Sequence, residues 1–154
     1  MSFIDLSHDI VNDMSTYPTD PNVSINRKKN IKNNNSLLHQ FKMGTHTGTH
    51  LDVPAHILEN GKTLDNFSID SFCGKAVKVD FGESDNLDKI DYNIEGIILN
   101  TGWYKNFNKP DIFYGKNRPK IPRNLIDYVL SNKLKFFCCC FKLLVVFLTI
   151  SNLI

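Results

Sequence analysis

Cysteine is scarce in this chain, and the few cysteines are badly placed for disulfide bonds. There are four, of which Cys138, Cys139 and Cys140 are adjacent to one another. Neighbouring cysteines cannot easily bridge each other, so we expect no disulfide framework. Residues 1–10 also lack the basic segment and apolar run of a signal peptide. Together these absences favour a protein of the reducing cytoplasm.

The chain also lacks a strong excess of either charge. Its 18 Lys and Arg and 16 Asp and Glu leave a net charge of +2, which indicates little about partners. The densest basic run, residues 26–35, has no aromatic residues among its charges, so we expect no nucleic-acid partner. With 154 residues, 42% of them hydrophobic, the chain is long enough for one domain with a buried core.

A nucleophile for acyl-enzyme chemistry is missing as well. No Gly-x-Ser-x-Gly sequence occurs anywhere in the chain. Cys73, in the segment SFCGK, is expected to be a small core residue.

The apolar pattern predicts both strands and a helix. Residues 75–81 alternate as a half-buried strand does, and residues 96–102 form a short apolar run between glycines. Residues 122–134 have apolar side chains at spacings of three and four, which predicts a helix. Further expectations are a short strand at 3–7, a loop at 17–22 and an extended segment at 36–44. Strands that precede a late helix indicate an α/β or α+β fold.

The most unusual segment is GTHTGTHLDVPAH, residues 44–56, which holds three of the five histidines. Gly48, Pro54 and the β-branched residues around them disfavour a helix, because proline alone costs about 3 kcal/mol in a helix interior. In an extended chain, side chains alternate between two faces. One face then carries His46, Gly48, His50, Asp52, Pro54 and His56. The other carries the small and apolar residues Thr47, Thr49, Leu51, Val53 and Ala55, which suit a core.

Two imidazoles and a carboxylate that converge are the ligand set of a borderline divalent metal, with Zn²⁺ the first expectation and Mn²⁺ the second. The absence of cysteine from this segment argues against a closed structural zinc site. Pro54 is expected to bend the end of the strand so that His56 turns back toward the other histidines. The alternative is that these are surface or hydrogen-bonding histidines on an edge strand. His8 and His39, which lie outside the segment, are expected to be surface or structural residues.

The segment HTGTHLDVPAH resembles the His-x-Gly-Thr-His-x-Asp-x-Pro-x-His signature of the cyclase-like metal-dependent hydrolases. That family includes kynurenine formamidase (arylformamidase), an enzyme of tryptophan catabolism, and isatin hydrolase. The segments IDLSHDI, MSTYPTDP, IILNTGW and IPRNLIDYVL agree with it in order and spacing, and the resemblance covers residues 3–135. It implies an α/β fold, a mixed-sheet swivelling β/β/α domain that is incomplete at its C-terminal end.

The resemblance also implies roles for individual residues. His46, His50 and Asp52 would bind a first metal, Asp52 would bridge to a second, and His56 would be the catalytic acid/base. Tyr17 would contact substrate, although an ordinary turn aromatic residue is an equal alternative. Asp20, beside Pro21, is expected to do no more than cap its turn.

The expected chemistry is hydrolysis of a formamide or cyclic amide C–N bond in a small-molecule substrate. Metal-bound hydroxide would attack the carbonyl while His56 shuttles the proton. The alternative is a non-catalytic, truncated remnant that binds one metal or a partner. The resemblance also suggests a homodimer.

The last residues, 136–154, change in character, because Lys142 is the one charged residue among them. We divide the chain into a family domain at 1–135 and an apolar, non-family tail at 136–154. The tail is interpreted as an aberrant or truncated end, with a membrane anchor and a buried strand or helix as alternatives, so membrane contact is expected only there. No histidine follows His56 and no glutamate follows Glu95, so the second metal site of the family is expected to be incomplete.

Overall fold

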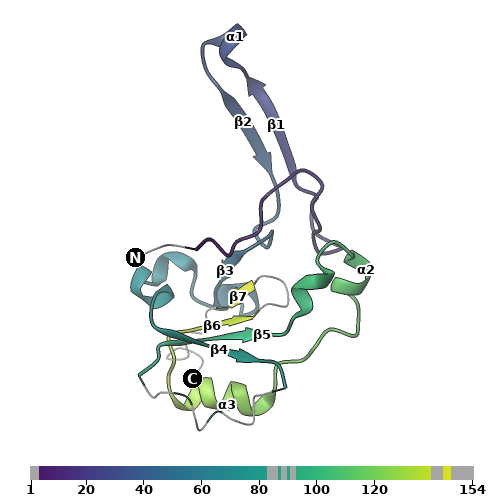
Figure 1. Ribbon diagram of the computed structural model, residues 1–154. Helices are drawn as coiled ribbons and strands as arrows, with labels where there is room; N and C mark the ends of the chain where they lie inside the picture. The colour runs from purple at the N-terminus through teal and green to yellow at the C-terminus, as the bar shows by residue number, and fades with distance from the viewer. Residues whose placement is uncertain (1–3, 83–86, 88–89, 91–92, 140–143, 147–154) are drawn as a thin grey trace.

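A mixed sheet of five strands forms the body of the molecule in this computed structural model, which describes residues 4–82, 87, 90, 93–139 and 144–146 (Figure 1). Its strand order is β3-β7-β6-β5-β4. The strands and helices of the chain are β1 (Ser24–Lys29), α1 (Ile31–Asn34), β2 (Leu38–Lys42), β3 (His50–Asp52), β4 (Ala76–Asp80), β5 (Gly96–Asn100), α2 (Pro110–Phe113), α3 (Arg123–Ser131), β6 (Phe136–Cys139) and β7 (Leu144–Val146).

Three neighbouring strands of this sheet, β4, β5 and β6, run parallel, and β7 is antiparallel to β6 but parallel to β3. Parallel strands need long crossover connections, and α3 provides the one between β5 and β6. The sheet is therefore mixed and the fold is α/β, which confirms the predicted fold class.

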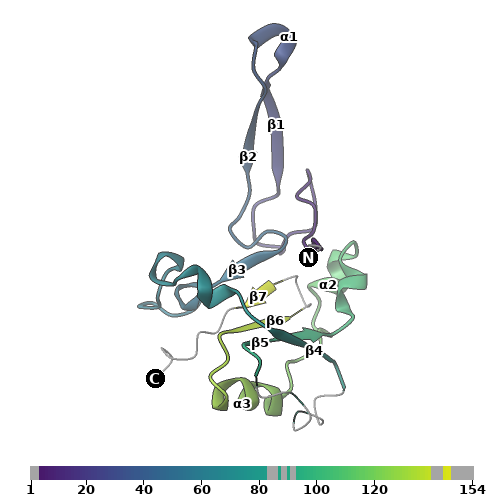
Figure 2. The same cartoon turned by 60° about the vertical axis from the view of Figure 1, so that its left-hand side comes forward.

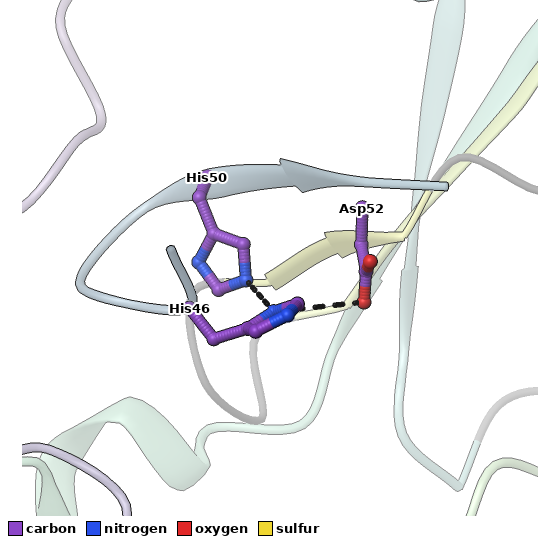
Figure 3. Close-up of side chains that lie close together, drawn as sticks. All are labelled: His46, His50 and Asp52. Atoms are coloured by element: carbon purple, nitrogen blue, oxygen red, sulfur yellow. Dashed lines mark hydrogen bonds and ion pairs between the residues drawn. The ribbon is translucent and has the colours of Figure 1, made fainter. Parts of the chain in front are cut away.

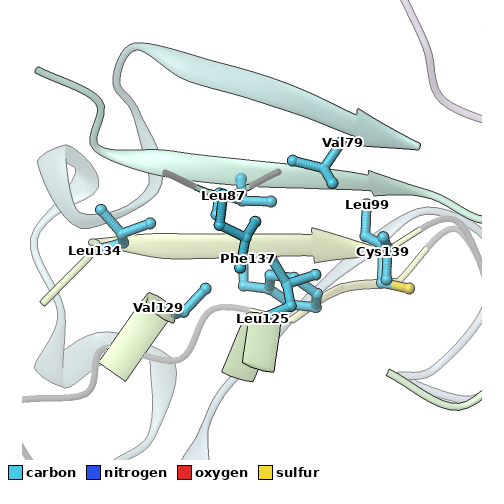
Figure 4. Close-up of a cluster of buried hydrophobic side chains, with 9 residues drawn as sticks. Val79, Leu87, Leu99, Leu125, Val129, Leu134, Phe137 and Cys139 are labelled. Atoms are coloured by element: carbon cyan, nitrogen blue, oxygen red, sulfur yellow. The ribbon is translucent and has the colours of Figure 1, made fainter. Parts of the chain in front are cut away.

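The core lies between the sheet and α3 (Figure 4). Ile97 and Leu99 on β5 are completely buried, as is Leu125 on α3, and Val129 is nearly so. The predicted helix is confirmed, but it ends at Ser131 because Lys133 adopts a left-handed backbone with φ +49°. Strands β4 and β5 confirm the two apolar patterns from which they were predicted.

An antiparallel hairpin of β1 and β2 extends away from the sheet, with α1 at its tip (Figures 1 and 2). Asn30 caps the short helix by accepting a hydrogen bond from the backbone N–H of Asn33, and Asn35 ends it in the left-handed region. The extended segment predicted at 36–44 is confirmed as β2.

Two expectations from the sequence are wrong for this part of the fold. Residues 4–7 form no strand, and Ile4 and Leu6 are exposed because no described strand pairs with this segment. Cys73 is exposed rather than part of the core, because it follows a surface 3-10 helix (Ile69–Phe72).

The apolar C-terminal segment contributes strands to the sheet where it is described. Phe136–Cys139 forms β6 beside β5, with Phe136, Phe137 and Cys139 buried, and Leu144–Val146 forms β7. Of the three interpretations of this segment, the buried strand is the one that Phe136–Cys139 adopts. Residues 140–143 and 147–154 lie outside the described part. Among the described residues, no helix is long and apolar enough to cross a membrane.

Candidate metal centre and its pocket

The histidine-rich segment bends twice instead of running straight. Gly48 has φ +60°, and only His50–Asp52 is a strand before a 3-10 helix begins at Pro54. The predicted extended chain from His46 to His56 is therefore wrong at both ends. Glycine permits the first bend because it has no Cβ, and proline suits the first turn of a helix. The second bend turns His56 back, as the position of Pro54 predicts.

The two faces of β3 are also reversed relative to the prediction. Asp52 is buried, with 8% of its surface exposed, whereas Leu51 is 42% exposed. The physical reason is that β3 is an edge strand of three residues, and β7 is its one partner among the described strands. The side of the strand that carries the ligands thus faces into the molecule.

Three side chains of this segment converge on one point, and we call His46, His50 and Asp52 the metal triad (Figure 3). His46 Nδ1 lies 3.1 Å from His50 Nε2 and 3.9 Å from Asp52 Oδ2. One ligand atom from each residue lies within 4.8 Å of the others. The 3.1 Å separation of the two nitrogens is close to the roughly 3.3 Å between ligand atoms in a tetrahedral site with bonds of about 2.0–2.1 Å, and the 3.9 Å separation is longer.

Local hydrogen bonds aim two of these side chains. His50 Nδ1 donates to the Gly48 carbonyl oxygen at 2.9 Å. This leaves a lone pair on His50 Nε2, which points toward the other two side chains of the triad. Asp52 Oδ1 accepts a hydrogen bond from the Val53 N–H at 2.9 Å. Asp52 Oδ2 has no hydrogen bond to any described residue, although the carboxylate is buried. A buried, unsatisfied carboxylate oxygen beside two imidazoles fits a divalent cation.

The protonation state of His46 suits the same role. Burial lowers the pKa of its imidazole below the usual value, and the neighbouring His56 lowers it further, against the opposite effect of Asp52. A neutral ring can carry its proton on Nε2, which leaves Nδ1 with a lone pair for a metal.

His56 adjoins the triad. Its ring packs against that of His46 with centroids 3.9 Å apart, and its Nε2 lies 3.9 Å from Asp52 Oδ2. The side chain is 44% exposed, so it borders both the triad and the solvent-filled space beside it.

A pocket of about 350 Å³ opens beside the triad. It is lined by the triad, His56 and Tyr17, which places all five predicted site residues around one cavity. The loop predicted at 17–22 forms a turn in which the Asp20 N–H donates to the Tyr17 carbonyl oxygen at 2.8 Å. Three further lining residues were not predicted: Thr19, Asp20 and Arg118. Nothing in the local sequence around Arg118 marks it as a site residue.

Contacts with the segment after α2 hold the Tyr17 loop in place. The Tyr114 hydroxyl donates to the Ser15 carbonyl oxygen at 3.3 Å, and the rings of Tyr17 and Tyr114 meet edge to face with centroids 5.6 Å apart. Burial, and then the negative charge of Asp20, raises the pKa of Tyr114, which keeps this hydroxyl protonated as a donor.

Comparison with known proteins gives one family. The model of the family described as putative cyclase matches residues 4–139, which includes β6. Kynurenine formamidase from Salinibacter ruber is 33% identical over 82 residues, covering 52% of this chain and 39% of that protein. Kynurenine formamidase from Bacillus mycoides is 29% identical over 118 residues, covering 71% of this chain and 56% of that protein. The chain thus spans about half the length of the curated relatives it matches.

A solved structure agrees with the sequence matches. Isatin hydrolase A from Ralstonia solanacearum superimposes with a TM-score of 0.66 over 88% of this chain and 65% of that chain, at 13% sequence identity. At that identity the likeness concerns the fold alone. It agrees with the mixed sheet described above. The match of the family model over most of the sequence shows that the chain belongs to the putative cyclase family.

Proposed function

We propose that this chain hydrolyses a formamide or cyclic amide C–N bond, as the names of its relatives, kynurenine formamidase and isatin hydrolase, suggest. The observation that carries the proposal is the convergence of His46, His50 and Asp52 at the wall of a pocket large enough for a small aromatic amide. Zinc is the metal we propose first, and manganese second, because two imidazoles and one carboxylate suit both.

A divalent ion in the triad would supply Lewis acidity and lower the pKa of water toward about 7. Residues of the chain would hold the metal, transfer the proton and contact the substrate. His46, whose pKa is lowered, and His50, whose Nδ1 donates to the Gly48 carbonyl oxygen, would each offer a lone pair, and the Val53 N–H holds Asp52 in place. His56 takes a proton from the attacking water and returns it to the departing nitrogen, since its ring borders both the triad and the pocket. Tyr17 supplies an aromatic wall for the substrate.

The test is metal-dependent turnover of N-formylkynurenine by the purified full chain, in parallel with metal binding measured by calorimetry. His50→Ala is expected to lose both, whereas His39→Ala, on the distant β2, keeps both. Metal binding that depends on His50 without any turnover would instead support the non-catalytic alternative. Equal metal binding by both variants would contradict the metal site itself.

Two expectations from the sequence accompany this proposal. The first is a reducing compartment such as the cytoplasm, with which the free, exposed thiol of Cys73 is compatible. The second expectation is a homodimer. Analytical ultracentrifugation of the purified chain would measure the mass of the assembly directly.

A further inference from the structure

The pocket beside the metal triad contains one guanidinium, that of Arg118. We propose that Arg118 forms an anion subsite that selects amides carrying a carboxylate on the part of the molecule away from the scissile bond. The inference rests on the proposed function and deepens it by naming a substrate class. It follows from where Arg118 lies, from what it contacts and from the chemistry of its side chain.

The chain holds Arg118 in place from both sides. Phe113, completely buried at the end of α2, and the Tyr114 hydroxyl bond to Ser15 anchor the segment before it. Pro119 follows directly and restricts the backbone of Arg118 to extended conformations. The anchoring contact also joins this segment to the loop of Tyr17. Arg118 and Tyr17 therefore line the same pocket although they are far apart in the sequence.

The guanidinium of Arg118 has no hydrogen bond and no ion pair with any residue that the structure describes. Arg123, by comparison, is paired, because its Nε lies 3.0 Å from Asp127 Oδ1. Asp20 lines the same pocket but lies too far from Arg118 to form an ion pair, and its charge acts on His46 and Tyr114. Arg118 is half-buried, so its charge is only partly exposed to solvent.

An arginine without a partner in a pocket is suited to a carboxylate. Its planar guanidinium can donate two parallel hydrogen bonds to the two oxygens, with a charge that does not titrate near neutral pH. The metal triad lines the same pocket, where the amide carbonyl would react. A substrate that reaches both groups would be fixed at two points, which sets the orientation of the amide relative to His56.

The test compares an anionic and a neutral substrate in the metal-loaded full chain, namely 4-formamidobenzoate and formanilide. Arg118→Gln is expected to reduce kcat/KM for 4-formamidobenzoate about tenfold to a hundredfold and to leave formanilide unchanged, since a hydrogen bond to a charged group is lost. Lys116→Gln removes the same charge from the same loop but outside the pocket lining, and it is expected to change neither substrate. Arg118→Lys keeps the charge without the paired donors and is expected to lie between Gln and the natural residue.

A second measurement does not depend on turnover. Calorimetric titration with benzoate and with benzamide is expected to show tighter binding of benzoate, and Arg118→Gln removes that difference. If Arg118→Gln loses the preference for benzoate over benzamide but the natural chain hydrolyses neither substrate, the subsite is supported and the proposed function is overturned. Hydrolysis with an unchanged preference between the two substrates in Arg118→Gln would overturn the subsite and leave the function standing. If the natural chain shows neither hydrolysis nor tighter binding of benzoate, both the subsite and the proposed function are overturned.

Discussion

Gly48 shows how a single residue shapes the candidate site. Its φ of +60° produces the bend that brings His46 back toward His50, and a Cβ there would come within 2.7 Å of Ile10 Cδ1. That contact is the flexible end of a side chain, so the backbone is the larger cost. A residue with a Cβ pays about 1–2 kcal/mol in the left-handed region.

Gly48→Ala is therefore expected to lower the free energy of unfolding by about 1–2 kcal/mol, measured by urea denaturation, and to weaken metal binding. Gly44→Ala is the matched control in the same segment. Gly44 has no positive φ, and an added Cβ would make only an ordinary contact with Pro21. Equal loss in both variants would show that the left-handed backbone at Gly48 is not what the site depends on.

A second prediction at this scale concerns His56. If it moves the proton, His56→Ala lowers kcat by about 10²–10⁴-fold, because general acid–base catalysis contributes that much. Metal affinity, measured by calorimetry, is expected to change far less, because His46, His50 and Asp52 provide the triad without it. An unchanged kcat in an active preparation would contradict the role given to His56. Loss of metal binding in His56→Ala would instead show that His56 is a metal ligand.

Among the elements, α3 was the most predictable and β3 the least. The spacing of Leu125 and Val129 fixes which face of the helix is buried, because helical periodicity depends on neighbours three and four residues away. β3 has three residues, and which of its faces is buried depends on the strand beside it. The sequence could therefore predict the ligands of this segment but not that Asp52 would be inside and Leu51 outside.

The same helix allows a stability prediction. Leu125→Ala is expected to lower the free energy of unfolding by about 2–5 kcal/mol, because Leu125 is completely buried against the sheet. Arg123→Ala removes only the exposed pair with Asp127 and is expected to cost less than about 1 kcal/mol. Urea denaturation of both variants measures the difference. A similar small loss in both would mean that α3 does not pack on the sheet as described.

Across the whole molecule, Glu95 links the starts of three strands. Its side chain accepts hydrogen bonds from the Lys135 ammonium and from the Lys75 N–H, at 2.9 Å for the latter, and its carbonyl oxygen accepts from the Lys135 N–H at 2.7 Å. Lys75 precedes β4, Glu95 precedes β5 and Lys135 precedes β6. First the Lys135 ammonium and then the Lys75 N–H hold the pKa of the Glu95 carboxyl below its usual value.

This arrangement predicts a loss of stability in acid. Because the pKa of Glu95 is lower in the folded than in the unfolded chain, its stabilisation is complete above the unfolded value of about 4.3 and is lost as the pH falls through the folded value. Urea unfolding midpoints are expected to fall over that range in the natural chain. In Glu95→Gln this part of the pH dependence should disappear. An identical acid profile in both proteins would mean that other carboxylates account for the loss.

The sequence by itself determined the ligand set, because His46, His50 and Asp52 lie within one short segment. The bend at Gly48 and the local bonds of His50 and Asp52 act between near neighbours in the chain. Only the tertiary structure decided what surrounds those ligands. Arg118 and Tyr17 reach the pocket through Phe113 and Tyr114, whose packing joins segments that are distant in sequence. Contacts of that kind leave no periodic signal, so the sequence predicted the ligands of the candidate metal site, and the structure added Arg118 to the lining of the pocket.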